Sequence, residues 1–482
     1  MRVLRFLWVR RLFVVLAITY GYFFQGGDPN QATRILLTRS IVDRGTPDIT
    51  AYHAVTIDKS EHEGRFYSDK APTVSLVATL PWALMNLLDR AFAIDASSRA
   101  AERARLHMIV LAVSVTAGVA AAALLRRLLL LFGSRERDAD LLTLGYGLGT
   151  LAFPFSTVLF GHQTAAAIVL AAFWLSVRTR SYSTRRLVVL GLLWGTSIVT
   201  EYPTGILVAC QGLYVLSADV RWRGIARVLG LSAVGAIVPF AVHSLFLWWA
   251  FGSPTKLPYT YMAEPIFLSH TSTGILGINA PSWVGFWGSL FSRYRGLFFY
   301  CPFLLLTFAG FRAWLLADER KAELRLCAAM VVAYVLFNAG YFAWDGGGST
   351  GPRHLVPALP YFVLPMGWFL QASARARTWA WVAIVPSVLI MLACTAVCIQ
   401  VPEGDPFRAN PLYQIVGTAL ARGEVAVNRQ DVFFLPTRGD ASYNLGLLAG
   451  LPGLASLLPL LAVWALGLSS YVRGASWRRS AA

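Results

Sequence analysis

Two aspartates in this sequence stand where they could act as a general base. Asp28 follows a pair of glycines, and Asp69 comes just before Lys70, whose ammonium group could hold an anion. Both positions border long apolar runs, and charged side chains at the edge of a membrane are costly to desolvate. Such residues are therefore functional candidates. The alternative interpretation is a solvated loop in which the aspartates and Lys70 form ordinary ion pairs.

Other polar residues could bind a substrate. Arg353 follows three consecutive glycines, which would let the backbone approach a ligand closely, and arginine offers two parallel donors to a phosphate. An acid beside an apolar run, such as Glu201, is a functional candidate by default, whereas a lone histidine is more often structural. The full set of candidate substrate-binding residues is Asn30, Arg34, Asp58, Tyr67, Lys70, His162, Glu201, Arg293, Arg295, Trp344, Arg353 and His354.

The elements that must position these residues are membrane-spanning helices. The 482 residues are 56% hydrophobic and only 14% charged, whereas soluble domains carry about 25% charged residues. The net charge of +17 comes from short basic clusters between apolar runs, as topology signals do, so we expect no nucleic-acid partner. The five cysteines lie in apolar stretches without metal-ligand spacing. The composition predicts an all-α polytopic membrane protein, and no metal or cofactor is expected.

Basic clusters mark the cytoplasmic side of a membrane protein, so the apolar runs between them must cross the membrane in alternating directions, which predicts about twelve spans. If the run Thr73–Leu88 also crossed the membrane, the basic cluster at Arg126 would lie outside the cell. Because it contains Pro81 and is shorter than the ~20 residues that a bilayer requires, we predict a juxtamembrane helix there. The predicted spans are the run ending at Phe24 and about 106–125, 139–160, 163–177, 187–202, 204–218, 228–250, 297–316, 324–343, 354–372, 379–400 and 446–471.

This topology places both termini in the cytoplasm and the bulk of the loops outside. The larger external segments are 25–104, 251–296, 344–353 and 401–445. Arg293 and Arg295 then lie on the side where basic residues are disfavoured, which suggests that they meet an anion. The sequence lacks a phosphate-binding GxxxxGK[ST] loop, an HExxH helix and a GxSxG elbow, so nucleotide hydrolysis, metalloprotease and esterase chemistry lack their usual markers.

Several of these motifs, in this order and on one membrane face, resemble those of bacterial GT-C superfamily glycosyltransferases. That group includes protein O-mannosyltransferases and the aminoarabinose transferase of lipid A. The resemblance covers residues 1–375, which we interpret as a catalytic module that includes loop 25–104, followed by C-terminal transmembrane helices in 376–482 with loop 401–445. The motifs that carry it are Asn30–Arg34, Ile41–Thr46, Tyr67–Pro72, Phe251–Pro254, Tyr294–Phe298 and Gly351–Pro360.

The resemblance implies a large first external loop with two juxtamembrane helices and a sugar donor linked to polyprenyl phosphate. It further implies transfer to a lipid, glycan or protein acceptor on the external face of the bacterial cytoplasmic (inner) membrane. An aspartate would accept the proton of the acceptor hydroxyl, and transfer would invert the anomeric centre. GT-C enzymes usually place an acidic base early in the first external loop, often as part of an Asp-Glu pair. Here Pro29 follows Asp28, so Asp28 is the first candidate for the base and Asp69 the second.

The cations that would stabilise the departing phosphate are Arg34, Lys70, Arg295 and Arg353. Two other functions stay open from the sequence. A transporter or lipid flippase would place Glu201 and His243 in one central cavity, and it would often show internal repeats, which are not evident here. An envelope glycan ligase would keep the external arginines and histidine but would need no aspartate base.

Overall fold

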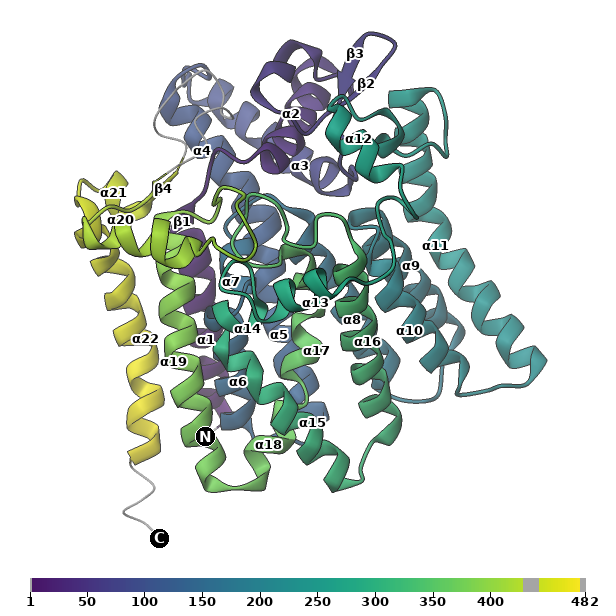
Figure 1. The fold of residues 1–482 in the computed structure, drawn as a ribbon, viewed down its shortest axis with the longest axis vertical. Helices are drawn as coiled ribbons and strands as arrows, with labels where there is room; N and C mark the ends of the chain where they lie inside the picture. The colour runs from purple at the N-terminus through teal and green to yellow at the C-terminus, as the bar shows by residue number, and fades with distance from the viewer. Residues whose placement is uncertain (1, 428–441, 477–482) are drawn as a thin grey trace.

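The computed structural model describes residues 2–427 and 442–476. A bundle of helices runs along the long axis, and a layer of shorter helices and two strands covers one end of it (Figure 1). The helices of the bundle are α1 (Arg2–Gly21), α5 (Thr116–Leu131), α6 (Glu136–Gly149), α8 (Gly161–Val177), α9 (Thr184–Thr200), α10 (Thr204–Leu216), α11 (Trp222–Phe251), α15 (Leu306–Ala317), α16 (Lys321–Gly340), α17 (Leu359–Val363), α18 (Met366–Ala372), α19 (Ala374–Val397) and α22 (Leu458–Ser476).

The covering layer comes from the first predicted external segment and from the segment after α11. It contains α2 (Pro29–Arg44), α3 (Thr73–Ala91), α4 (Arg99–Val110), α12 (Pro265–Thr271) and the hairpin β2 (Ser60–His62) and β3 (Arg65–Tyr67). Helix α4 continues through a π-helical turn at Leu111–Val115 into α5. Shorter helices connect the rest: α7 (Ala152–Phe155), α13 (Trp283–Leu290), α14 (Leu297–Tyr300), α20 (Thr418–Ala421) and α21 (Leu445–Leu448).

The bundle agrees with a multi-pass membrane protein. Among the described residues, five helices are long and apolar enough to cross a bilayer: Arg99–Leu131, Trp222–Phe251, Lys321–Gly340, Arg353–Ala372 and Arg375–Val397. Shorter apolar helices, among them Gly161–Val177 and Thr204–Leu216, lie in the same bundle. The number of twelve crossings, the cytoplasmic termini and the boundary at residue 375 stay predictions.

Several predicted spans are interrupted or shifted. The predicted span 139–160 ends as regular helix at Gly149, and α7 with Pro154 follows. The predicted span 297–316 breaks before Pro302, because proline cannot donate the next helical hydrogen bond. Helix α22 begins at Leu458 rather than at 446, since Pro452 lies in extended backbone.

The juxtamembrane helix predicted at Thr73–Leu88 is present as α3, outside the bundle (Figure 1). Its exposed apolar side chains follow helical spacing and share one face: Val77, Leu80, Leu84 and Leu87. The opposite side packs on α2, where Trp82 Nε1 donates to Asp43 Oδ1 at 3.0 Å. An apolar stripe of this kind is typical of a helix that lies in the membrane interface.

The last described segments pack against the first. Strand β1 (Phe23–Phe24) pairs antiparallel with β4 (Tyr443–Asn444). Trp464 Nε1 of α22 donates to Thr19 Oγ1 of α1 at 2.8 Å. The predicted loop 401–445 is described up to residue 427 and from 442 onward, while residues 428–441 lie outside the described residues, as do 1 and 477–482.

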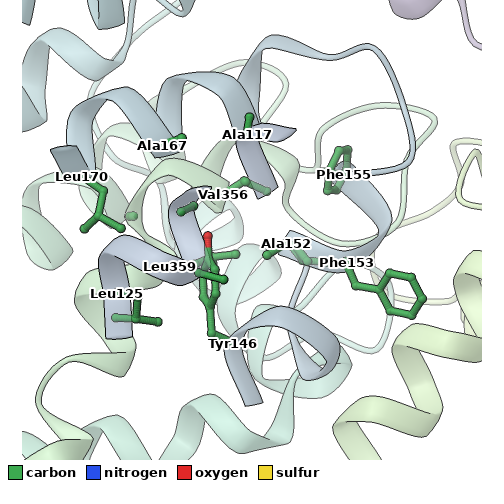
Figure 2. Close-up of a cluster of buried hydrophobic side chains, with 14 of the residues drawn as sticks. Ala117, Leu125, Tyr146, Ala152, Phe153, Phe155, Ala167, Leu170, Val356 and Leu359 are labelled. Atoms are coloured by element: carbon green, nitrogen blue, oxygen red, sulfur yellow. The ribbon is translucent and has the colours of Figure 1, made fainter. Parts of the chain in front are cut away.

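Close helix packing holds the bundle together. Figure 2 shows one buried cluster, in which Tyr146 of α6 lies among apolar side chains of α5, α8 and the segment that leads into α17. Glycine brings α9 and α11 together: a Cβ atom on Gly191 would lie 1.8 Å from the carbonyl oxygen of Ser232. Small residues commonly allow such backbone approach between membrane helices. The turn that follows α9, at Glu201 and Tyr202, lines the site described next.

Candidate active site

A cavity of about 530 Å³ lies where the covering layer meets the adjoining ends of the bundle helices. Segments far apart in sequence build it: the start of α2, the loop before α3, the turn between α9 and α10, helix α12 and the glycine-rich loop 344–353. Nine of the residues predicted from the sequence line it: Asp28, Asn30, Arg34, Asp58, Lys70, His162, Glu201, Arg353 and His354.

Asp28 is the N-terminal cap of α2. Its Oδ1 accepts hydrogen bonds from the backbone N–H groups of Asn30 at 2.8 Å and Gln31 at 3.2 Å, and Pro29 opens the helix. Within the described residues no donor meets Oδ2, which leaves that oxygen available to a ligand. Burial raises the pKa of Asp28 to about 6, although the nearby charge of Arg353 opposes the rise. A base with such a pKa is ionised near neutral pH.

Lys70 lies between two carboxylates. Its Nζ is 2.9 Å from Asp58 Oδ2 and 2.6 Å from Asp69 Oδ2. Burial alone would lower the pKa of Lys70, but the two carboxylates more than offset that effect and raise it. Burial also raises the pKa of Asp69 to about 6 against the attraction of Lys70. Asp69 does not line the cavity; it lies against Lys70, and its predicted role as a second base stays untested.

Arg34 is fully engaged by neighbouring residues. Its Nη2 is 3.2 Å from Glu201 Oε1, its Nε donates to Asn30 Oδ1 at 3.1 Å, and its Nη1 donates to the carbonyl of Ala71 at 3.1 Å. His162 Nδ1 lies 3.6 Å from the same Glu201 oxygen. These contacts fix the wall of the cavity and neutralise the charge of Arg34.

Arg353 differs from the other two cavity cations. No carboxylate partner meets its guanidinium within the described part of the chain; the group lies 5.4 Å from the ring centroid of Phe160, and its buried Nε has no hydrogen-bond partner. His354 Nε2 is likewise buried without a partner, and its ring meets the rings of His162 and Tyr341 edge-on. Arg353 is therefore the cation best placed to meet an added anion.

Glycines shape the loop that carries Arg353. Gly346, Gly347 and Gly351 have φ values of 80°, 63° and 62°, in the left-handed region that side chains rarely adopt. A Cβ atom on Gly346 would lie 3.0 Å from Arg353 Cγ. The loop thus folds back against the arginine, which agrees with the close approach expected from its sequence.

Four predicted substrate-binding residues lie outside the cavity lining: Tyr67, Arg293, Arg295 and Trp344. Arg295 is fully buried, and its Nη2 donates to the carbonyls of Gly347, Val401 and Pro402 at 3.0–3.2 Å. Arg293 donates to the carbonyl of Phe407 at 3.1 Å. Both arginines on the predicted outer side thus contact backbone carbonyls, although the buried Nε and Nη1 of Arg295 meet no hydrogen-bond partner among the described residues.

The other two predicted residues pack in the walls. Tyr67 lies against Phe251, with ring centroids 5.1 Å apart. Trp344 lies edge-on to Tyr294, at 6.4 Å between centroids. Neither side chain reaches the ligand space in this structure, so both contribute packing.

Several cavity residues escaped the sequence analysis. They are Tyr202, Tyr259, His270, Tyr341, Asp345 and Glu403, together with an apolar wall from α12 and its neighbours that includes Met262, Ile266, Phe267 and Phe342. The chain has 18 tyrosines, and no spacing distinguishes these three from the rest. Burial raises the pKa of Tyr341 to about 12, so this hydroxyl stays protonated and can donate to a ligand.

His243 does not line the cavity. Its Nε2 is 3.4 Å from the hydroxyl of Tyr202, which separates it from the ligand space. The arrangement expected of a transporter, with Glu201 and His243 in one central cavity, is therefore not found.

Solved structures of one protein match this chain in fold over most of its length. ArnT from Cupriavidus metallidurans bound to undecaprenyl phosphate matches with a TM-score of 0.51 and 15% identity, over 96% of this chain and 74% of that chain. The apo state of the same protein matches with a TM-score of 0.51 and 16% identity over the same shares. This chain shares the fold of that ArnT.

The resemblance seen in the sequence is thus confirmed at the level of the fold. The archaeal oligosaccharyltransferase AglB from Archaeoglobus fulgidus, in complex with an inhibitory peptide and a dolichol-phosphate, matches more weakly. Its TM-score is 0.47 at 11% identity, over 83% of this chain and 57% of that chain, too distant to add to the argument. No protein-family model and no curated protein matches the sequence.

Proposed function

We propose that this protein is a membrane glycosyltransferase that moves a sugar from a polyprenyl-phosphate donor to an envelope acceptor. Transfer takes place on the external face of the bacterial inner membrane. The observation that carries the proposal is that Asp28 and Arg353 line one cavity. Among the residues that the structure describes, Oδ2 of Asp28 has no hydrogen-bond donor and the guanidinium of Arg353 has no carboxylate partner. The GT-C fold, shared with a protein crystallised with undecaprenyl phosphate, supports the same conclusion.

The reaction is a direct displacement at the anomeric carbon. The acceptor hydroxyl attacks that carbon and loses its proton to Asp28, a general-base role worth about 10²–10⁴-fold in rate. The bond between the anomeric carbon and the phosphate oxygen breaks, and its electron pair leaves with the polyprenyl phosphate. Attack from the face opposite the leaving group inverts the anomeric centre. No step of this scheme uses a metal.

The leaving phosphate gains negative charge, and Arg353 stabilises it. Fixed cations placed where charge develops are usually the largest contribution to catalysis. Arg34 and Lys70 already pair with Glu201, Asp58 and Asp69, so they hold the cavity walls and add a weaker field. Of these three cations that line the cavity, only Arg353 can bind the phosphate without first breaking an ion pair.

The test is turnover of radiolabelled undecaprenyl-phosphate sugars by the purified protein with candidate envelope acceptors. Asp28→Asn and Arg353→Ala should each lower turnover of an active donor at least about 100-fold, while Asp318→Asn, an exposed site paired with Lys321, should not. An Asp28→Asn variant with normal turnover would favour the glycan ligase, which needs no aspartate base. Failure to consume any lipid-linked sugar would count against the transferase itself.

A further inference from the structure

Asp345 is a cavity carboxylate that the mechanism above leaves without a role. Both of its oxygens are held: Oδ1 accepts a hydrogen bond from the backbone N–H of Gly347 at 3.0 Å, and Oδ2 accepts one from the hydroxyl of Tyr294 at 3.2 Å. An ionised carboxylate has about four lone-pair sites and no donor. Asp345 therefore keeps acceptor capacity in a fixed orientation.

The loop that carries Asp345 is held on its other side as well. Arg295 donates to the carbonyl of Gly347 and to those of Val401 and Pro402. The hydroxyl of Tyr294 accepts a hydrogen bond from the backbone N–H of Gly404 at 3.0 Å. These contacts fasten the glycine-rich loop to the segment after α19. A group fixed in this way pays little further ordering cost when it binds a ligand.

Asp345 lies next to the proposed phosphate site. Gly346 follows Asp345 in the chain and begins the glycine-rich turn. A Cβ atom on Gly346 would lie 3.0 Å from Arg353 Cγ. Asp345 and Arg353 thus flank the same glycine, and both line the cavity. In a sugar phosphate a single oxygen joins the phosphorus to the ring. A phosphate on Arg353 therefore brings the hydroxyl groups of that ring to the neighbourhood of Asp345.

We infer that Asp345 accepts a hydrogen bond from a ring hydroxyl of the donor sugar and thereby determines which sugar is transferred. Tyr294 is the positioning residue that orients this carboxylate. The inference rests on the proposed function, because it takes the phosphate of the donor to lie on Arg353. The negative charge of Asp345 would repel the phosphate itself, so its partner must be a donor, and a sugar hydroxyl is that donor.

The experiment compares binding of two ligands to the full-length protein in lipid nanodiscs. One is undecaprenyl phosphate without a sugar, and the other is the best bound of undecaprenyl-phosphate glucose, mannose and galactose. A hydrogen bond to a charged group contributes about 1.5–3 kcal/mol, or roughly 10- to 100-fold in affinity. Asp345→Asn should weaken binding of the glycosylated donor by that factor and leave binding of undecaprenyl phosphate within about twofold.

Two further variants separate orientation from contact. Tyr294→Phe removes only the hydroxyl, so it should raise the KM for the glycosylated donor several-fold with kcat nearly unchanged. Arg353→Ala should weaken both ligands, and Asp318→Asn should weaken neither. A donor that lacks the hydroxyl bound by Asp345 can also be tested on the wild-type protein. Its affinity should be no higher than the affinity of Asp345→Asn for the complete donor.

Three results would overturn the inference. Equal losses for both ligands in Asp345→Asn would mean that Asp345 only maintains the loop. Unchanged affinity for every glycosylated donor would mean that the carboxylate does not meet the sugar. If the wild-type protein binds no undecaprenyl phosphate at all, the proposed function fails first and this inference fails with it.

Discussion

Asp28→Asn is expected to make the protein more stable and much less active at the same time. Asparagine caps a helix about as well as aspartate, so its amide oxygen can keep the hydrogen bonds from Asn30 and Gln31. The substitution removes the ionisable group and leaves the local structure in place. Loss of the general base should lower turnover by about 10²–10⁴-fold.

The gain in stability follows from the burial of Asp28, which is 2% exposed. Its pKa rises from the usual 3.8 to about 6, and one pKa unit corresponds to about 1.4 kcal/mol, so the ionised group costs the folded protein about 3 kcal/mol at most. Because the folded pKa exceeds the unfolded one, the wild-type protein loses this stability as pH rises from about 4 through about 6. The variant has no such loss.

The assay is thermal unfolding in detergent at about pH 4.5, 6 and 8, beside turnover of a lipid-linked sugar. The melting temperature of Asp28→Asn should be nearest to that of the wild type at the lowest pH and should exceed it by a few degrees at the highest. Ser98→Asn, which exchanges one cap of α4 for another, should change neither quantity. A melting difference independent of pH, or turnover within about twofold of the wild type, would refute the reasoning.

Three further outcomes are expected. Arg353→Ala should weaken binding of undecaprenyl phosphate about 10- to 100-fold, with partial recovery in Arg353→Lys, as measured by titration in nanodiscs. Lys70→Met should destabilise the protein by about 3–5 kcal/mol in thermal melts, because it leaves the buried Asp69 and the partly buried Asp58 unpaired, and addition of Asp69→Asn should restore part of that loss. A cysteine at exposed Ser97 should react with an impermeant maleimide in intact cells, whereas one at exposed Thr179 should react only after permeabilisation; the reverse pattern would contradict the predicted topology.

Much of the bundle could be predicted because the bilayer imposes one simple rule. A span must be apolar over ~20 residues, and the predicted runs near 163–177, 204–218, 228–250 and 379–400 each contain a helix of the structure. Counting crossings also identified α3 as a helix outside the bundle. The predicted span boundaries were wrong at prolines. Pro302 and Pro452 lie within apolar runs of the sequence, but regular α-helix is interrupted at each of them.

The candidate site could be predicted in part. Residue type and loop position were enough to group Asp28, Lys70 and Arg353 in one cavity. Whether a cation is free depends on partners that the sequence does not reveal, such as Glu201, which pairs with Arg34 across 167 positions. Arg295 shows the same limit: the sequence does not reveal that its guanidinium lies outside the cavity lining and donates to backbone carbonyls.

The pairing of β1 with β4 and of α1 with α22 bears on how the chain is assembled in the cell. The hydroxyl of Tyr22, which follows α1, donates to the carbonyl of Ser456, 434 positions further along the chain, at 2.6 Å. The partners of this region are therefore synthesised long after α1 itself. Until then Phe23 and Phe24 lack the strand that pairs with them, so a nascent chain that stops before residue 443 lacks the contacts that close β1 on β4.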